Sequence, residues 1–253
     1  MLYLFRQLRR RILKSSESRR YFIYAIGEIV LVVIGILIAL QINNWNEKKN
    51  ARQFELTMLN EVRSALLQDK DYVGSHIPFR MSYAKNGLSY FNRWLRGKST
   101  DRDSVDYHFK RMFNSFHVTL NRGPYEALKF TGLDKVSNDS LRNQMVHVYD
   151  FVYPRYERFL VRTEESRRDR LWELYDKLRV ERELVLSNDE VRIPNPGMRD
   201  IDFSQDQDFL EFLDITASRV NSSEYSVGEF VPQIDSLIVL LNHEIGNAST
   251  SQD

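Results

Sequence analysis

The feature that most constrains this chain is an uninterrupted apolar segment near its N-terminus. Residues 21–40 contain one charged side chain, Glu28, and thirteen of these twenty residues are Phe, Ile, Leu or Val. As a helix rising about 1.5 Å per residue, the segment is roughly 30 Å long, which matches the hydrocarbon thickness of a bilayer. Its apolar side chains favour insertion by about 6 kcal/mol, against a cost of at most about 3 kcal/mol for Glu28. We therefore predict a transmembrane helix over residues 21–42.

The charges around this segment predict its orientation. Residues 1–20 carry seven Lys and Arg against a single acidic residue, whereas only three basic residues follow the segment closely. Because basic residues are retained on the cytoplasmic side, the arm 1–20 is predicted to be cytoplasmic and the rest of the chain to lie outside. Trp45 is then expected to act as an anchor at the outer membrane–water interface.

Two secretion signals are alternatives to a permanent anchor. A cleaved signal peptide has an apolar region of about 7–15 residues that ends in small residues. Here the apolar run is longer and ends in Leu40, Gln41 and Ile42. A twin-arginine export signal is the other alternative, because residues 18–23 suit that pattern. The length of the run favours a signal anchor.

The apolar segment also carries a family resemblance. Residues 24–47 read YAIGEIVLVVIGILIALQINNWNE after a basic amphipathic arm. This motif resembles an uncharacterised family of single-pass membrane proteins from Bacteroidota, the domain of unknown function 6090. A second stretch resembles the same family at Tyr125, Leu128, Lys129, Gly132, Leu133, Asn138, Asp139, Ser140, Leu141, Arg142 and Tyr149. The resemblance implies a Gram-negative inner membrane and a periplasmic domain, and it implies no activity.

The chain as a whole has the composition of a folded protein. Its 253 residues are 42% hydrophobic and 12% aromatic, and the net charge of +1 gives no general support for nucleic-acid binding. The absence of Cys excludes disulfides and thiolate metal sites. Apolar residues recur at spacings of three and four. We predict a mainly α fold, in which the membrane helix precedes an elongated antiparallel helical bundle, periplasmic, over residues 43–245, with a disordered tail at 246–253.

Glycine, proline and capping residues predict where the first helices begin and end. The membrane helix is expected to continue with little break into an apolar stripe over residues 51–73. A second helix is predicted to begin at Pro78 and to end at Gly97, and a third to follow Asp101.

The same signals predict the later elements. Pro124 is expected to open a short helix that Gly132 ends, and Asn138 or Ser137 to cap a long helix over about 139–184. A loop is predicted over 187–203, because its prolines and glycine are incompatible with a helix. Further helix starts or kinks are predicted at Pro154, Ser204, Ser226 and Pro232.

Glu28 is the most informative single residue, because an ionisable group inside a membrane span is costly and suggests a function. Helical spacing places it on one face with Val32, Gly35 and Ala39. Gly35 and Ala39 form a pair of small residues that allows another helix to approach closely. We expect this face to contact a membrane-protein partner or a second copy of the chain. A purely structural role and a proton-carrying role for Glu28 are the alternatives.

In the soluble part, Tyr125, Lys129 and Arg142 are considered as contacts for a ligand or partner. The alternative is that this segment only ends one helix and begins the next. No catalytic, cofactor-binding or metal-ligating residue is predicted. The five His lack the spacing of metal ligands, and the chain has no GxSxG motif, phosphate-binding glycine loop or dinucleotide fingerprint. The charge-dense stretch 155–183 mixes both signs and is expected to be a solvated helix face.

These features predict a non-enzymatic, membrane-anchored periplasmic protein that interacts with partners or acts as a sensor through them. The bilayer and another membrane protein, or a second copy, are the expected partners. One alternative is a small subunit of an ion-driven inner-membrane complex that uses Glu28. The other is a membrane-tethered hydrolase, which no motif in the chain specifically supports.

Overall fold

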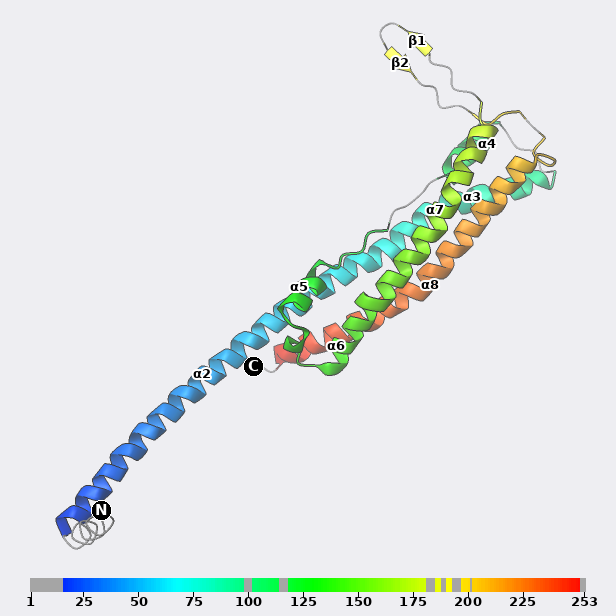
Figure 1. The fold of residues 1–253 in the computed structure, drawn as a ribbon. Helices are drawn as coiled ribbons and strands as arrows, with labels where there is room; N and C mark the ends of the chain where they lie inside the picture. The colour runs from blue at the N-terminus through cyan, green and yellow to red at the C-terminus, as the bar shows by residue number, and fades with distance from the viewer. Residues whose placement is uncertain are drawn as a thin grey trace, which may run out of the picture. The chain divides into compact units, whose positions relative to one another are not determined.

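The computed structural model describes residues 16–97, 102–113, 118–180, 185–187, 190–192, 197–200 and 202–250, and these are mainly α-helical (Figure 1). The chain divides into two compact units, Met1–Leu56 and Thr57–Asp253. Helix α2 (Ser16–Asp71) contributes residues to both units.

In the second unit the predicted helix between Pro78 and Gly97 is present, but it is continuous with the helix before it. Helix α2 passes through a π-helical segment, η1 (Tyr72–His76), directly into α3 (Ile77–Leu95). Pro78 lies in the first turn of α3, as predicted, although α3 follows η1 without a break in the helix. After α3, Gly97 adopts a φ of 76°, a left-handed conformation that glycine tolerates. The predicted third helix is α4 (Arg102–Met112).

Two further predicted boundaries are also confirmed. Helix α5 (Gly123–Thr131) has Pro124 in its first turn and ends at Gly132, and the 3₁₀ turn η2 (Leu133–Lys135) follows. The side chain of Asn138 then accepts a hydrogen bond of 3.1 Å from the Leu141 amide at the start of the next helix. The side-chain oxygen of an Asn at this position accepts from a backbone N–H that has no partner within the helix.

The predicted long helix is divided into three parts and is shorter than expected. It consists of α6 (Asp139–Val146), the π-helical segment η3 (His147–Val152) and α7 (Tyr153–Leu178). The irregularity predicted at Pro154 is therefore η3, which ends just before this proline.

The prediction that this helix continues to residue 184 is wrong. Beyond Leu178 the backbone is extended, because it pairs with a later segment instead of with the helix. The Val180 amide donates to the Gly197 carbonyl at 2.9 Å, and the Arg199 amide donates to the Leu178 carbonyl at 2.8 Å. These bonds satisfy groups that the end of α7 exposes.

The predicted loop also contains a short hairpin. Strands β1 (Val185–Ser187) and β2 (Glu190–Arg192) pair antiparallel, with Leu186 opposite Val191. The prediction of a loop over 187–203 is wrong for Ser187 and for β2, because the β-branched and aliphatic residues of the two segments favour strand pairing.

The C-terminal region forms one helix, α8 (Gln207–Thr250), so the helix starts predicted at Ser204 and Ser226 are wrong. The side chain of Asp206 caps α8 instead, accepting from the Phe209 amide at 2.8 Å. Pro232 lies inside the helix. Its cost of about 3 kcal/mol is offset because this part of α8 buries an apolar row: Phe230, Ile234, Leu237 and Leu241. The helix continues past the predicted end at Ile245.

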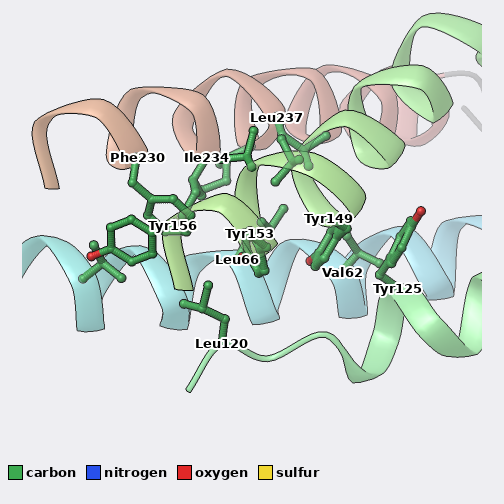
Figure 2. Close-up of a cluster of buried hydrophobic side chains, with 14 of the residues drawn as sticks. Val62, Leu66, Leu120, Tyr125, Tyr149, Tyr153, Tyr156, Phe230, Ile234 and Leu237 are labelled. Atoms are coloured by element: carbon green, nitrogen blue, oxygen red, sulfur yellow. The ribbon is translucent and has the colours of Figure 1, made fainter. Parts of the chain in front are cut away.

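Within the second unit, α7 and α8 lie side by side and run in opposite directions, as Figure 1 shows. Contacts along the pair demonstrate this, because residues near the start of α7 contact the middle of α8 and residues near the end of α7 contact the start of α8. Tyr156 stacks on Phe230, whereas Arg170 bonds to Glu211. Two apolar clusters form the core. One joins the end of α2 to η3, α7 and α8 (Figure 2), and the other joins α3, α4, α7 and the start of α8.

Candidate functional site

The apolar segment has no core to pack against. The described residues contain one continuous helical stretch that is long and apolar enough to cross a membrane, and the apolar window within it is not buried. Glu28, Val32, Gly35 and Ala39 are all exposed, and so is Trp45. The Lys49 ammonium lies 5.6 Å from the Trp45 ring, close enough for a cation–π contact. An exposed apolar surface of this kind is typical of a segment that is covered by lipid or by another protein.

Two of the three predicted ligand contacts meet, at the Asp150 carboxylate near the surface of their own domain. The Tyr125 hydroxyl donates to Asp150 at 3.1 Å, and the Lys129 ammonium lies 3.0 Å from the same carboxylate. Tyr125 is fully buried. Arg142 lies apart from them, bonded to the Val136 carbonyl and to Asp139. This arrangement favours a structural role for the three residues, since each is bonded within its own domain.

Tyr125 is the outermost member of a row of buried tyrosines. Its ring stacks on Tyr149 with centroids 4.4 Å apart, and Tyr149 contacts Tyr153 at 4.8 Å (Figure 2). The Tyr153 hydroxyl donates to the Asp69 carboxylate at 2.7 Å, and the Asn121 amide donates to the same group at 2.9 Å. The row therefore connects a buried carboxylate on α2 to a surface carboxylate on η3.

Burial controls the electrostatics of this row. It raises the pKa of the Asp69 carboxyl above its usual value, although the Asn121 amide, the Tyr153 hydroxyl and the Arg122 charge act in the opposite direction. Burial also raises the pKa of the Tyr149 and Tyr153 hydroxyls, so both tyrosines stay neutral. Such groups are suited to hydrogen bonding within a core and are not nucleophiles.

Further along the chain, polar pairs close the seam between α7 and α8. Arg170 makes a two-pronged contact with Glu211, one bond being 2.7 Å long. The buried Arg219 guanidinium bonds to Glu164 at 2.9 Å and 3.3 Å, and Arg167 reaches Ser222 at 3.4 Å.

Beyond Ser222 the seam opens into a pocket of about 250 Å³. One wall comes from η3 and α7, at positions four residues apart: His147, Phe151, Arg155 and Phe159. The other wall comes from α8, also at intervals of four: Tyr225, Glu229 and Gln233. The stacked rings of Tyr156 and Phe230, 3.9 Å apart, contribute to the lining between the walls. The α7–α8 pocket is thus largely aromatic, with charged groups in both walls.

The charges of the α7–α8 pocket differ from those of the closed part of the seam. Arg155 and Glu229 occupy opposite walls, and both side chains are exposed. Within the described part of the chain, neither side chain has an ion-pair or hydrogen-bond partner. A guanidinium and a carboxylate therefore remain available beside apolar surface.

The sequence interpretation missed this pocket. It treated residues 155–183 as a solvated face and did not relate them to α8. The usable signal was the spacing of Phe151, Arg155 and Phe159, which places two aromatic rings and a cation on one helix face.

The described residues contain no group of three or more His, Asp or Glu placed to hold a metal ion.

Comparison with known proteins identifies a family without an assigned activity. A family of unknown function (DUF6090) matches residues 28–178, more than half of the 253-residue chain, and confirms the resemblance to this uncharacterised family. No curated protein and no solved structure matches the chain. The match begins at Glu28 and ends at the last residue of α7, so it includes the tyrosine row and one wall of the pocket. The chain therefore belongs to this family of unknown function.

Proposed function

We propose that this protein is a single-pass inner-membrane protein whose helical domain is periplasmic and interacts with a partner. The observation that carries the proposal is the exposed apolar segment over residues 21–42, which follows a strongly basic arm. Its length suits a bilayer core, and the excess of basic residues before it favours a cytoplasmic N-terminus. The antiparallel packing of α7 and α8 supports the helical bundle expected for the periplasmic part.

The partner contacts the face of the segment that holds Glu28, Val32, Gly35 and Ala39. A carboxylate in a bilayer needs a polar neighbour, and the small residues on the same face let a second helix approach.

Site-specific photo-cross-linking in native membranes tests this face. A benzophenone amino acid replaces Val32 on the Glu28 face, and in a matched control it replaces Leu37, which helical geometry places on the opposite face. A discrete protein adduct from position 32, weak or absent from position 37 and reduced by Glu28→Gln, is the expected result. Equal adducts from both positions, or lipid adducts alone from both, would contradict a specific helix partner.

A further inference from the structure

We propose that the α7–α8 pocket binds a free α-amino acid with an apolar or aromatic side chain. Three properties of the pocket support this ligand: opposite charges in its two walls, an aromatic lining between them, and a volume of about 250 Å³. This inference is independent of the partner proposed for the membrane segment.

The charges select a zwitterion. Arg155 supplies a planar guanidinium that suits a carboxylate, and Glu229 supplies a carboxylate that suits an ammonium group. On the closed part of the seam, charges of these types pair with each other, as Arg170 does with Glu211. At the pocket they lie in opposite walls without partners among the described side chains. A molecule with both charges satisfies both walls at once, whereas a simple acid or amine satisfies one.

The lining selects an apolar side chain. Phe151 and Tyr225 are 64% and 63% exposed, an unusual state for large rings that flank a pocket. The buried pair Tyr156 and Phe230 adds apolar surface between them. Covering such rings with an apolar group removes their surface from water and favours binding by about 25 cal/mol per Å².

The shape favours a small molecule over a protein segment. On the side of the pocket toward the C-terminal end of α7, the Arg167–Ser222 and Arg219–Glu164 contacts close the seam. On the opposite side, toward the N-terminal end of η3, α6 packs on α8, and the Asn138 side chain bonds to Glu244 at 2.8 Å. A partner helix would need an open groove longer than this. A second copy of the same concave surface would leave the hollow unfilled, because two hollows are not complementary to each other.

Isothermal titration calorimetry on the full chain in detergent micelles tests the proposal. The probes are L-phenylalanine, L-tyrosine, L-tryptophan, L-leucine and L-methionine. For the best of them, the amide lacks the carboxylate and the N-acetyl derivative lacks the ammonium group. We expect the unmodified amino acid to bind at least about tenfold more tightly than either derivative, since each derivative loses one charged hydrogen-bonding group.

Two variants test which side chain binds each charged group of the amino acid. Arg155→Gln should weaken amino-acid binding by about tenfold or more and abolish the preference for the acid over its amide. Glu229→Gln should weaken amino-acid binding by a similar factor and abolish the preference for the free amino acid over its N-acetyl derivative. Both side chains are exposed, so both variants should fold, which circular dichroism verifies. Arg158→Gln is the matched control, because Arg158 is an exposed α7 residue that does not line the α7–α8 pocket.

Three results would overturn the proposal. The first is no detectable binding of any of the five amino acids at concentrations up to about 10 mM. The second is binding that neither Arg155→Gln nor Glu229→Gln changes. The third is self-association of the chain that Arg155→Gln abolishes without any ligand, which would make a second copy the occupant.

Discussion

At the scale of single residues, Asp69 is a buried carboxyl group whose hydrogen-bond donors come from other segments of the chain. It is a carboxylate with 4% of its surface exposed, and it accepts hydrogen bonds from the Tyr153 hydroxyl and the Asn121 amide. Nothing in the sequence around Asp69 indicates this role, because both donors come from distant segments. By contrast, the roles of Pro78, Gly132 and Asn138 are local and were predicted correctly.

The raised pKa of Asp69 predicts a pH dependence of stability. Because burial raises this pKa in the folded state, the folded chain holds a proton that the unfolded chain releases. The contribution of Asp69 to the free energy of unfolding is therefore largest below the ordinary Asp pKa of about 4. It falls as the pH rises from there through the raised folded value.

Asp69→Asn tests this dependence, because an amide does not titrate. The free energy of unfolding of the full chain in detergent is measured by urea denaturation from acidic to neutral pH. The wild-type value minus the variant value should fall with rising pH. A difference that rises with pH would mean that the carboxylate is stabilised in its charged form.

Gly132 provides a second residue-scale prediction. Its φ is 112°, well outside the left-handed α region at about +57° that other residues tolerate, so a side chain strains the backbone there. Gly132→Ala should therefore lower the free energy of unfolding by roughly 1–3 kcal/mol. Gly97→Ala is the matched control, because the φ of Gly97 is 76°, closer to that region, and no atom lies within 4 Å of the added Cβ. Urea denaturation showing an equal or larger loss for Gly97→Ala would contradict this explanation.

At the scale of elements, the sequence interpretation was correct where local signals determine the structure and wrong where tertiary contacts do. Helices bounded by proline, glycine or a capping residue begin and end as expected. The end of α7 at Leu178 was missed, because the backbone there pairs with residues 197–199. The continuity of α8 through Pro232 was missed because its apolar row contacts helices far away in the sequence. The α7–α8 pocket was missed for the same reason.

The seam between α7 and α8 gives an element-scale prediction. The Arg219 side chain is 4% exposed and its partner Glu164 is 15% exposed, whereas Arg170 and Glu211 are 37% and 41% exposed. Arg219→Gln leaves a largely buried carboxylate without its cation and should cost roughly 3 kcal/mol of stability. Arg170→Gln removes a solvent-screened pair and should cost much less. Comparable losses in urea denaturation would show that burial does not distinguish the two pairs.

At the scale of the whole molecule, the N-terminal apolar segment and the helical domain imply different environments. The segment exposes large aliphatic side chains along its length, whereas the second unit buries its apolar residues in two clusters. Composition and periodicity predict this contrast, because both depend on sequence-local patterns. Neither pattern identifies the partner of the Glu28 face, since a partner is a property of another chain.

The proposed function depends on residues 21–42 spanning the membrane, and the chain is well suited to a direct test because it contains no Cys. Ser18→Cys places a single thiol before the segment, and Ser236→Cys places one on the exposed surface of α8. Each variant is treated with a membrane-impermeant maleimide in intact spheroplasts and again after lysis. The prediction is that Cys at 236 reacts in intact spheroplasts and Cys at 18 reacts only after lysis. Labelling of both thiols in intact spheroplasts, or of neither until lysis, would contradict a periplasmic domain on a single membrane anchor.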